Sequence, residues 1–400
     1  MKSRPKVLAI ILAGGKGGRL GPLTADRAKP AMPFGGTHRL IDFALSNCLH
    51  SGLADVWVVE QYELHTLNDH LANGRPWDLD RTHGGLQVLP PSVEGGGGEE
   101  KGEGGFAQGN ADALWRQREL LRQFAPDLLL VLSADHLYRM DFRDLLDAHA
   151  VYGNPALTLV STRVPPGEDP RRFSLLRVEE GSGRVTDFAY KPADPAGREL
   201  LAAEVFLFDA PSLVTTLEEL ATGEAPLQDY GHALLPRLVE RGGVFAHPLE
   251  GYWRDVGTLE SFWRAHRDLL SDPPVLRVDD PAWPILTAGQ QRQPARVYAS
   301  ARVDNSLLSP GCEVRGRVER SVLGPGVRVA EGATVRDSIV FHEAHIEAGA
   351  EVRHAIVDEK ARLGAGARVG APPRLTVVPR AECVAPGARV LPEEDAPAIS

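Results

Sequence analysis

The C-terminal part of this 400-residue chain carries a 17-residue repeat, which restricts its possible folds more than any other sequence feature. Three stretches align without a gap: Ser321–Asp337, Ser338–His354 and Ala355–Ala371. Within them an aliphatic residue recurs every six positions, with small residues such as Ala and Gly between. The recurring residues are Leu323, Val329 and Val335, then Val340, Ile346 and Val352, then Val357, Leu363 and Val369, and finally Val378, Val384 and Val390.

A period of six residues fits neither an α-helix nor a flat β-strand. It fits a triangular coil whose three sides are short parallel strands, each turning one aliphatic side chain inward. We therefore predict a β-helix of about five coils of hexapeptide repeats over residues 296–400. Its open ends and apolar sides favour a role in oligomerisation rather than in chemistry.

The first 270 residues show a different rhythm, in which short apolar runs alternate with helical patterns. Strands are expected at Val7–Ala13, Asp55–Val59, Leu128–Leu132 and Leu157–Thr162, and the spacing of apolar residues predicts a helix from Ile41 to Leu49. This order is typical of an α/β domain with a mostly parallel sheet, which binds ligands beyond the carboxyl ends of its strands.

Two segments interrupt this pattern. Gly95–Gly105 contains only Gly, Glu and Lys and is expected to form a mobile surface loop. One interpretation is that this loop acts as a lid. Ser271–Pro294 is rich in Pro and Asp, as in a linker. We therefore expect domains at 1–270 and 296–400, joined by a linker at 271–295.

Composition excludes several classes of protein. No apolar run approaches the roughly 18 residues of a membrane span. The three cysteines are far apart, which indicates neither a disulfide framework nor a zinc site and favours a reducing cytoplasm. A net charge of −10 argues against a nucleic-acid partner.

The glycine-rich turn that follows the first strand is a candidate phosphate site. Its backbone N–H groups are free to face an anion, and Lys16, Arg19, Arg27 and Lys29 lie within or soon after it. The spacing matches neither the dinucleotide fingerprint nor the P-loop. We interpret the turn as a polyphosphate cradle; the alternative is a tight turn with solvated basic residues.

Several motifs, in order along the chain, resemble the glucose-1-phosphate adenylyltransferase family. They are Gly14-Gly15-x-Gly17-x-Arg19-Leu20, Arg27-Ala28-Lys29-Pro30-Ala31, Phe34-Gly35-Gly36, Asp42-Phe43-Ala44-Leu45-Ser46-Asn47, Gly109-x-Ala111-Asp112, Ser133-x-Asp135-His136-x-Tyr138, Lys191-Pro192, Tyr252–Leu259 and Trp283-Pro284-Ile285. The resemblance implies an α/β nucleotidyltransferase domain with a mostly parallel, Rossmann-like sheet, followed by a left-handed parallel β-helix.

The resemblance also implies a reaction and a set of site residues. ATP and glucose 1-phosphate would form ADP-glucose and pyrophosphate in glycogen or α-glucan biosynthesis. Arg19, Lys29 and Asp135 would be catalytic, and Asp135 and Asp255 would share a Mg²⁺ ion. Gly14, Gly15, Gly17, Gly109 and Asp112 would bind the nucleotide, and Lys191, Tyr190 and Glu204 the sugar phosphate.

Each assignment has a plainer alternative. Asp135 could be a helix N-cap, Asp255 the partner of Arg254 or another base, and Lys191 a solvated turn lysine. A cytoplasmic homo-oligomer, a tetramer in this family, is expected.

The sequence departs from the family pattern mainly on the sugar side. The changed positions are Ala107, Asn110, Ser174, Tyr190, Ala202 and Glu204, with Ser92 changed near the base. Two other functions therefore stay open: a nucleotidyltransferase for a different sugar 1-phosphate, with Glu204 and Tyr190 making new hydroxyl contacts, and a non-catalytic regulatory paralogue.

Overall fold

The computed structural model describes residues 4–15, 17–91, 106–223, 227–289 and 291–392. The described residues do not include Lys16 or residues 92–105, which contain Ser92 and the glycine-rich segment Gly95–Gly105. The chain forms two compact units, one of residues 1–15 and 43–253 and the other of residues 16–42 and 254–400. Segment 16–42 thus groups with the C-terminal part, so these units differ from the sequence domains 1–270 and 296–400, which stay a prediction.

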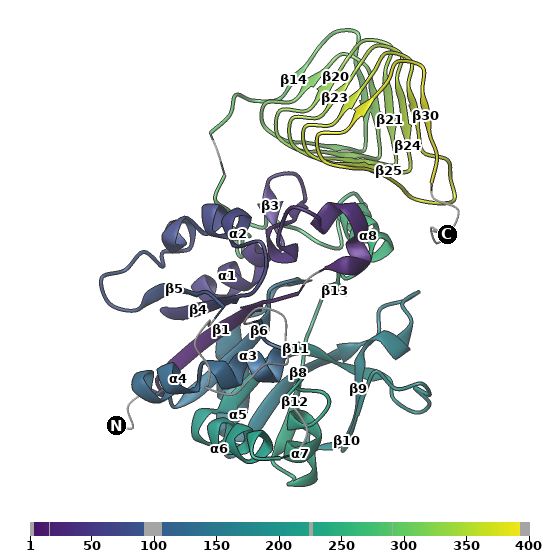
Figure 1. Cartoon of the computed structure of the whole chain (residues 1–400). Coiled ribbons are helices and arrows are strands. Elements are labelled where there is room, and N and C mark those ends of the chain that lie inside the picture. The colour runs from purple at the N-terminus through teal and green to yellow at the C-terminus, as the bar shows by residue number, and fades with distance from the viewer. Residues whose placement is uncertain (1–3, 16, 92–105, 224–226, 290, 393–400) are drawn as a thin grey trace, which may run out of the picture. The chain divides into compact units, whose positions relative to one another are not determined.

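The first unit is built on a nine-stranded sheet whose main path is β10-β9-β11-β6-β1-β4-β5 (Figure 1). The central strand β1 pairs in parallel with β4 and β6, as the apolar runs predicted. The strands are β1 (Val7–Ala13), β4 (Asp55–Glu60), β5 (Gly85–Leu89), β6 (Leu128–Ser133), β8 (Leu157–Arg163), β9 (Ser174–Val178), β10 (Val185–Tyr190), β11 (Leu200–Asp209) and β12 (Val244–Pro248).

One long strand of this sheet runs antiparallel to each of its neighbours and was not expected from the sequence. Strand β11 is antiparallel to β6, β8 and β9. It follows β9 and β10 without an intervening α-helix, and connections without a crossover helix favour antiparallel pairing. The sheet is therefore mixed, with a parallel centre.

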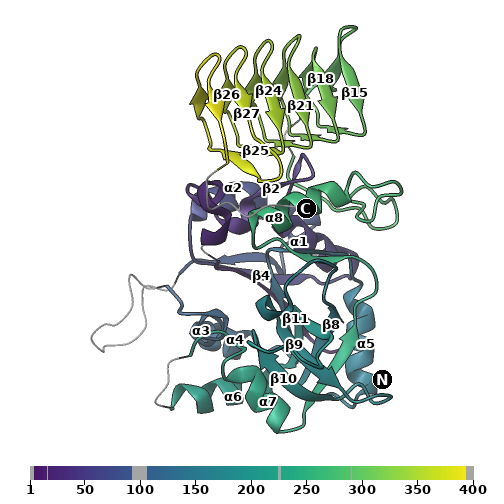
Figure 2. The same ribbon diagram turned by 90° about the vertical axis from the view of Figure 1, so that its right-hand side faces the viewer.

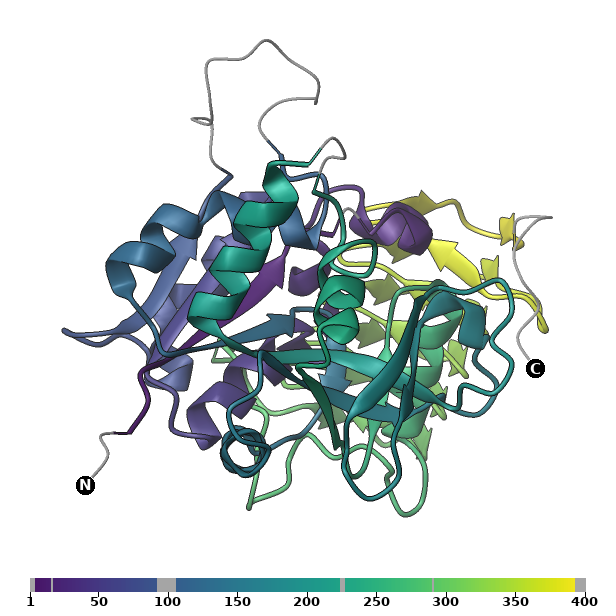
Figure 3. The same ribbon diagram turned by 90° about the horizontal axis from the view of Figure 1, so that it is seen from below.

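Helices cover both faces of the sheet (Figure 3). Residues of β1 such as Leu8 and Ile10 share a buried cluster with α3 (Asn110–Arg116), α4 (Arg118–Phe124), α6 (Ala210–Ala221) and α7 (Leu234–Glu240). The unit also contains α2 (Leu64–Leu71), α5 (Phe142–Val151) and most of α1 (Ile41–His50). The predicted helix is thus confirmed as α1, and Gly52, with φ of +74°, lies just beyond its end.

The repeat region forms a left-handed parallel β-helix, as predicted. Leu323 pairs with Val340 and Val340 with Val357, and all three side chains are fully buried. Figure 2 shows the coils stacked one on the next. The first sheet contains β14 (Arg296–Val297), β17 (Glu313–Val314), β20 (Arg328–Val329), β23 (His345–Ile346), β26 (Arg362–Leu363) and β29 (Cys383–Val384). The second contains β15 (Arg302–Asp304), β18 (Arg317–Glu319), β21 (Thr334–Arg336), β24 (Glu351–Arg353), β27 (Arg368–Val369) and β30 (Arg389–Val390), and the third contains β16 (Leu307–Leu308), β19 (Val322–Leu323), β22 (Ile339–Val340), β25 (Ala355–Val357) and β28 (Thr376–Val378).

The last complete coil is longer than the repeat. Val357 pairs with Val378, 21 positions later, whereas Val340 pairs with Val357 at the repeat distance of 17. The additional residues lie between β27 and β28, where Ala371 and Arg374 form an isolated antiparallel bridge. The aliphatic six-residue step continues after this corner, so the inner surface keeps its register.

The remaining short elements are β2 (Pro33–Phe34), β3 (His38–Arg39), β7 (His136–Tyr138), β13 (Trp253–Asp255) and α8 (Leu259–Asp268). Among the described residues, none of the helices has the length and apolar character needed to cross a bilayer.

Candidate functional site

The carboxyl ends of three neighbouring strands bring several predicted site residues to one edge of the first unit. Gly14 and Gly15 follow β1, and Asp135 comes two residues after the end of β6. Ala134, which lies between β6 and Asp135, donates its N–H to Leu12 O at 3.3 Å. A Cβ on Gly14 would lie 2.7 Å from the amide group of Gln61, which follows β4. The expected position of Gly14 and Asp135 at the strand ends is therefore confirmed.

Asp135 lies in the turn between β6 and β7, so the helix N-cap alternative is wrong: a strand follows, not a helix. Ser133 Oγ donates to Asp135 Oδ1, and His136 Nε2 lies 3.7 Å from the same oxygen. The Asp135 side chain is 23% exposed, which leaves carboxylate surface available to a ligand.

The predicted sugar-side residues Tyr190 and Lys191 form a hydrogen-bonded chain with a residue that the sequence did not reveal. Lys191 Nζ donates to Tyr190 Oη at 2.7 Å, and this hydroxyl donates to Asp229 Oδ2 at 2.7 Å. Asn110 N–H reaches Asp229 Oδ1 at 3.2 Å. Lys191 is exposed, as the solvated-lysine alternative expected, but its ammonium group has a defined protein partner.

Gly109 and Asp112 have local structural roles in the same region. A Cβ on Gly109 would lie 2.4 Å from the carbonyl carbon of Gln228, so only glycine permits this close approach of two backbone segments. Asp112 Oδ2 accepts bonds from Gln108 N at 2.9 Å and from Arg116 Nε at 3.1 Å. These contacts fix the start of α3.

Glu204 occupies an unusual backbone conformation in the middle of β11. Its φ of +54° is rare for a residue with a side chain, and the pairing of β11 with β8 shifts register between Ala202 and Phe206. Nearby, burial raises the pKa of Tyr230 well above its usual range, and the negative charges of Glu204, Asp229 and Asp135 act in the same direction. These acidic groups therefore surround one buried phenol.

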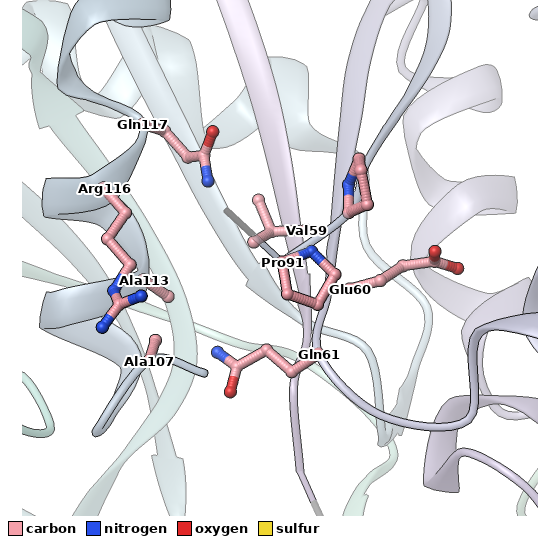
Figure 4. Close-up of a pocket in the computed structure, with 9 residues that line it drawn as sticks. Val59, Glu60, Gln61, Pro91, Ala107, Ala113, Arg116 and Gln117 are labelled. Atoms are coloured by element: carbon pink, nitrogen blue, oxygen red, sulfur yellow. The ribbon is translucent and has the colours of Figure 1, made fainter. Parts of the chain in front are cut away.

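A small, partly open pocket lies beside the end of β4 (Figure 4). Gln61 points across it towards Ala107, while Gln117 comes from the junction of α3 and α4. Its lining residues are Val59, Glu60, Gln61, Pro90, Pro91, Ala107, Ala113, Arg116 and Gln117.

Glu60 is the strongest electrostatic anomaly at this pocket. Its side chain is 1% exposed, and burial raises its pKa to about 7 although Asn68 Nδ2 donates to Oε2 at 3.1 Å. Within the described part of the chain, Oε1 is buried without a hydrogen-bond partner. Glu60 therefore titrates close to neutral pH.

The second unit brings together the other predicted charged residues. Lys29 Nζ lies 3.7 Å from Asp255 Oδ1, and both side chains are largely buried. A Cβ on Gly257 would lie 2.9 and 3.0 Å from the Asp255 carboxylate oxygens and 3.1 Å from Arg19 Nη2. Arg19, Lys29 and Asp255 therefore form one charged cluster.

Local structure explains how this cluster is held. Gly17 adopts a left-handed φ of +65°, and its carbonyl accepts bonds from Thr24 Oγ1 at 3.0 Å and Leu20 N at 2.8 Å. Ser261 Oγ donates to the carbonyl of Asp255, and Thr258 caps α8. The loop that carries Asp255 is thus anchored to the start of a helix.

The predicted polyphosphate cradle needs correction at Arg27. Its guanidinium is 4% exposed, and Nη2 donates to both oxygens of the fully buried Asp358 at 2.7 Å. Its charge is therefore neutralised inside the protein, which removes Arg27 from the group of cations facing the turn. Lys16 lies outside the described residues, so Arg19 and Lys29 remain.

Asp135, in the first unit, and Asp255, in the second, each carry carboxylate oxygens of the kind that binds Mg²⁺. Mg²⁺ takes oxygen ligands, commonly from one or two carboxylates together with substrate phosphates, and both carboxylates keep exposed surface of 23% and 15%. Within the described ranges, no group of three or more His, Cys, Asp or Glu side chains is arranged to hold a metal.

Sequence reasoning missed Asp229, Tyr230, Glu60 and Asp358. Asp229 and Tyr230 follow no motif or periodic pattern, and their proximity to Tyr190 and Glu204 comes from tertiary structure alone. Glu60 ends an apolar strand, which offered a weak signal.

Comparisons with known proteins agree with this architecture. Residues 8–272 match the family described as Nucleotidyl transferase, and residues 293–376 match the one described as GlmU-like, C-terminal hexapeptide. The glucose-1-phosphate adenylyltransferase of Desulforamulus reducens is 39% identical over 344 residues, which cover 86% of this chain and 84% of the relative. Those of Thermosipho africanus (39%; 82% and 78% covered) and Bacillus cytotoxicus (38%; 86% and 90% covered) are similarly related. Since such relatives cover most of both chains, the chain belongs to the glucose-1-phosphate adenylyltransferase family.

Proposed function

We propose that this protein forms ADP-glucose and pyrophosphate from ATP and glucose 1-phosphate, the donor-forming step of glycogen or α-glucan synthesis. Its relationship to enzymes named for this activity supplies the reaction. The observation in this chain that supports the same reaction is the cluster of Arg19, Lys29 and Asp255 within the second unit.

In the proposed reaction an oxygen of the sugar phosphate attacks the α-phosphorus of ATP. A new P–O bond forms while the bond from the α-phosphorus to the bridging oxygen breaks, and pyrophosphate leaves with the electron pair. Such a transfer depends on positioning and charge neutralisation rather than on a covalent enzyme intermediate. Arg19 and Lys29 hold the β- and γ-phosphates and stabilise the negative charge that grows on the leaving group.

Asp135 and Asp255 would hold the divalent ion, which neutralises phosphate charge when bound. The backbone N–H groups of Gly14, Gly15 and Gly17 face the triphosphate. Gly109 and Asp112 position the start of α3 beside the nucleotide, and the pocket between Gln61 and Ala107 receives the base.

On the sugar side, Lys191 binds the phosphate of glucose 1-phosphate. Tyr190 and Glu204 accept or donate hydrogen bonds with the sugar hydroxyls. Asp229 holds the Tyr190 hydroxyl at 2.7 Å and so orients the Tyr190–Lys191 pair.

The variant Asp135→Asn tests the catalytic proposal. Removing one charge from the metal-binding pair is expected to lower pyrophosphate-forming turnover by several orders of magnitude while thermal unfolding stays as in the wild type. Turnover is measured by pyrophosphate release at saturating magnesium. Full activity of the variant would remove Asp135 from the mechanism.

A different sugar 1-phosphate is the second candidate, because Glu204 adopts a strained conformation beside the acidic groups around Tyr230. Steady-state assays of nucleoside triphosphates against sugar 1-phosphates distinguish the two. A clear preference for ATP with glucose 1-phosphate would dispose of this alternative. No turnover with any pair would favour a regulatory paralogue instead.

We also propose that the protein acts in the cytoplasm as a homo-oligomer, with a tetramer as the expected state. Val297, Val303 and Leu307 are exposed on the first coil of the β-helix, which supports a subunit contact there. Light scattering coupled to size-exclusion chromatography measures the state directly, and a monomer at micromolar concentration would contradict the proposal.

A further inference from the structure

A pair of adjacent carboxylates in the β-helix holds the segment that carries the phosphate-binding residues. Arg27 Nη2 donates to both oxygens of Asp358 at 2.7 Å, and Arg27 Nη1 lies 3.5 Å from Glu359 Oε1. Asp358 is 0% exposed and Arg27 4% exposed. Because the pair is closed off from water, it is far less screened than a surface ion pair.

The second carboxylate reaches the other end of the same segment. Glu359 Oε1 lies 3.4 Å from Arg39 Nη1, and the Glu359 carboxylate is also within 3.7 Å of Arg380 and His342. Residues 16–42 are thus connected to the β-helix at two arginines that lie twelve positions apart. The segment cannot move without breaking these contacts.

The carboxylates themselves stand on a rigid support. They follow directly after β25, whose three residues are fully buried and paired with β22 and β28. Asp358 N–H donates to Val378 O at 2.9 Å, which fixes its backbone to the next coil. The β-helix therefore offers an anchor whose position is set by its own core.

The connection from Arg27 to Lys29 is short and stiff. Lys29–Ala31 forms a 3₁₀ turn in which Ala31 N bonds to Ala28 O at 2.9 Å and Met32 N to Lys29 O at 3.0 Å. Pro30 fixes one more backbone dihedral, and Ala28 and Met32 are buried. A displacement of Arg27 is therefore transmitted to Lys29.

We propose that Asp358, supported by Glu359, is a positioning residue for triphosphate binding: through Arg27 it sets the place of the Lys29 ammonium beside Asp255. This inference rests on the phosphate-binding role proposed for Lys29. It gives the β-helix a part in the reaction besides the proposed subunit contact.

A purely structural role of Asp358 would affect stability alone, whereas a positioning role affects triphosphate affinity. The full-length protein is therefore compared with Asp358→Asn, in which Arg27 keeps only the more distant Glu359 carboxylate as a charged partner. The measured quantities are the KM for ATP, kcat, and the Kd for ATP from equilibrium dialysis. We expect the KM and Kd for ATP to rise about tenfold with a smaller change in kcat, and Asp358→Glu to recover most of the affinity.

Glu319→Gln is the matched control. Glu319 is a buried β-helix carboxylate, but it pairs with Arg317 and Arg336 of the β-helix itself. Its ATP affinity should equal that of the wild type. If Asp358→Asn fails to fold, Glu359→Gln replaces it, with an expected rise in Kd of about threefold.

A folded Asp358→Asn protein with an unchanged Kd for ATP would overturn the inference, as would an equal loss of affinity in Glu319→Gln. Lys29→Gln separates this failure from failure of the proposed function. If Lys29→Gln binds ATP normally, the phosphate role of Lys29 is wrong. If Lys29→Gln binds weakly and Asp358→Asn normally, only the positioning role is wrong.

Discussion

Arg27 and Lys29 are two residues apart in one motif, yet their charges are used in opposite ways. Arg27 is enclosed by Asp358 and Glu359, with contacts as short as 2.7 Å. Lys29 has its carboxylate partner Asp255 at a longer distance, 3.7 Å. One cation is therefore neutralised within the fold, while the other is the one proposed above to bind phosphate.

The difference shows why counting cations near a glycine-rich turn overestimates a binding site. A guanidinium with several planar donors suits a buried carboxylate pair, whereas a lysine ammonium is a compact charge on a flexible stem. Which role each residue takes depends on a carboxylate more than two hundred positions away in the sequence.

The largest effect on stability should come from replacing Arg27, the cation enclosed by the two carboxylates. Arg27→Leu leaves Asp358 buried without its main partner, and the free energy of unfolding should fall by about 3–5 kcal/mol. Chemical denaturation measures the loss. Arg292→Leu, which disrupts the more exposed pair with Glu343, should cost under about 1 kcal/mol.

The double variant Arg27→Leu with Asp358→Leu sharpens this test. Because it removes both charges together, most of the lost stability should return. An equally unstable double variant would mean that packing, rather than the unpaired charge, accounts for the loss.

A smaller effect is expected from replacing Lys29, and it should be catalytic. Lys29→Gln removes one group that stabilises the departing pyrophosphate, so turnover should fall by about 10²–10³-fold. Initial rates at saturating ATP measure this loss. The unfolding midpoint should change little, and a destabilisation as large as that of Arg27→Leu would erase the distinction between the two residues.

The third test concerns an uncharged contact of the same N-terminal segment. His266 Nε2 accepts a bond from Gly35 N at 3.2 Å, Nδ1 donates to Phe262 O at 2.9 Å, and burial lowers the pKa of His266 to about 4. An unfolded histidine titrates near 6.5. Between pH 6.5 and 4 the unfolded chain therefore binds more protons, and stability falls as the pH is lowered.

His266→Gln removes this titration but keeps a donor and an acceptor. Between pH 7 and 4.5 the variant should lose about 2 kcal/mol less stability than the wild type. Denaturation curves at both pH values provide the comparison. The pKa of His342 is also lowered to about 4, mainly by burial, so part of the pH dependence should persist in the variant.

Regular patterns made much of the fold predictable. The aliphatic residues every six positions predicted the β-helix and its register, because each coil repeats the contacts of the previous one. Continuous apolar runs located β1, β4, β6 and β8. The antiparallel direction of β11 could not be predicted, because a strand buried on both faces lacks the alternation of apolar and polar residues that is typical of antiparallel sheets.

The candidate site was less predictable, because its residues interact over long sequence distances. Motifs identified Gly14, Asp135 and Lys29, but not that Asp229 would hold the Tyr190 hydroxyl. The raised pKa of Glu60 depends on burial, which the sequence around it does not specify.

The corner between β27 and β28 already accommodates additional residues while the paired strands on either side stay in step. The pairing of the stacked coils therefore does not depend on the length of this connection. A fluorophore or a short affinity peptide inserted near Ala371 should leave the neighbouring coils unchanged, which makes the corner a practical attachment point for following assembly of the protein in solution.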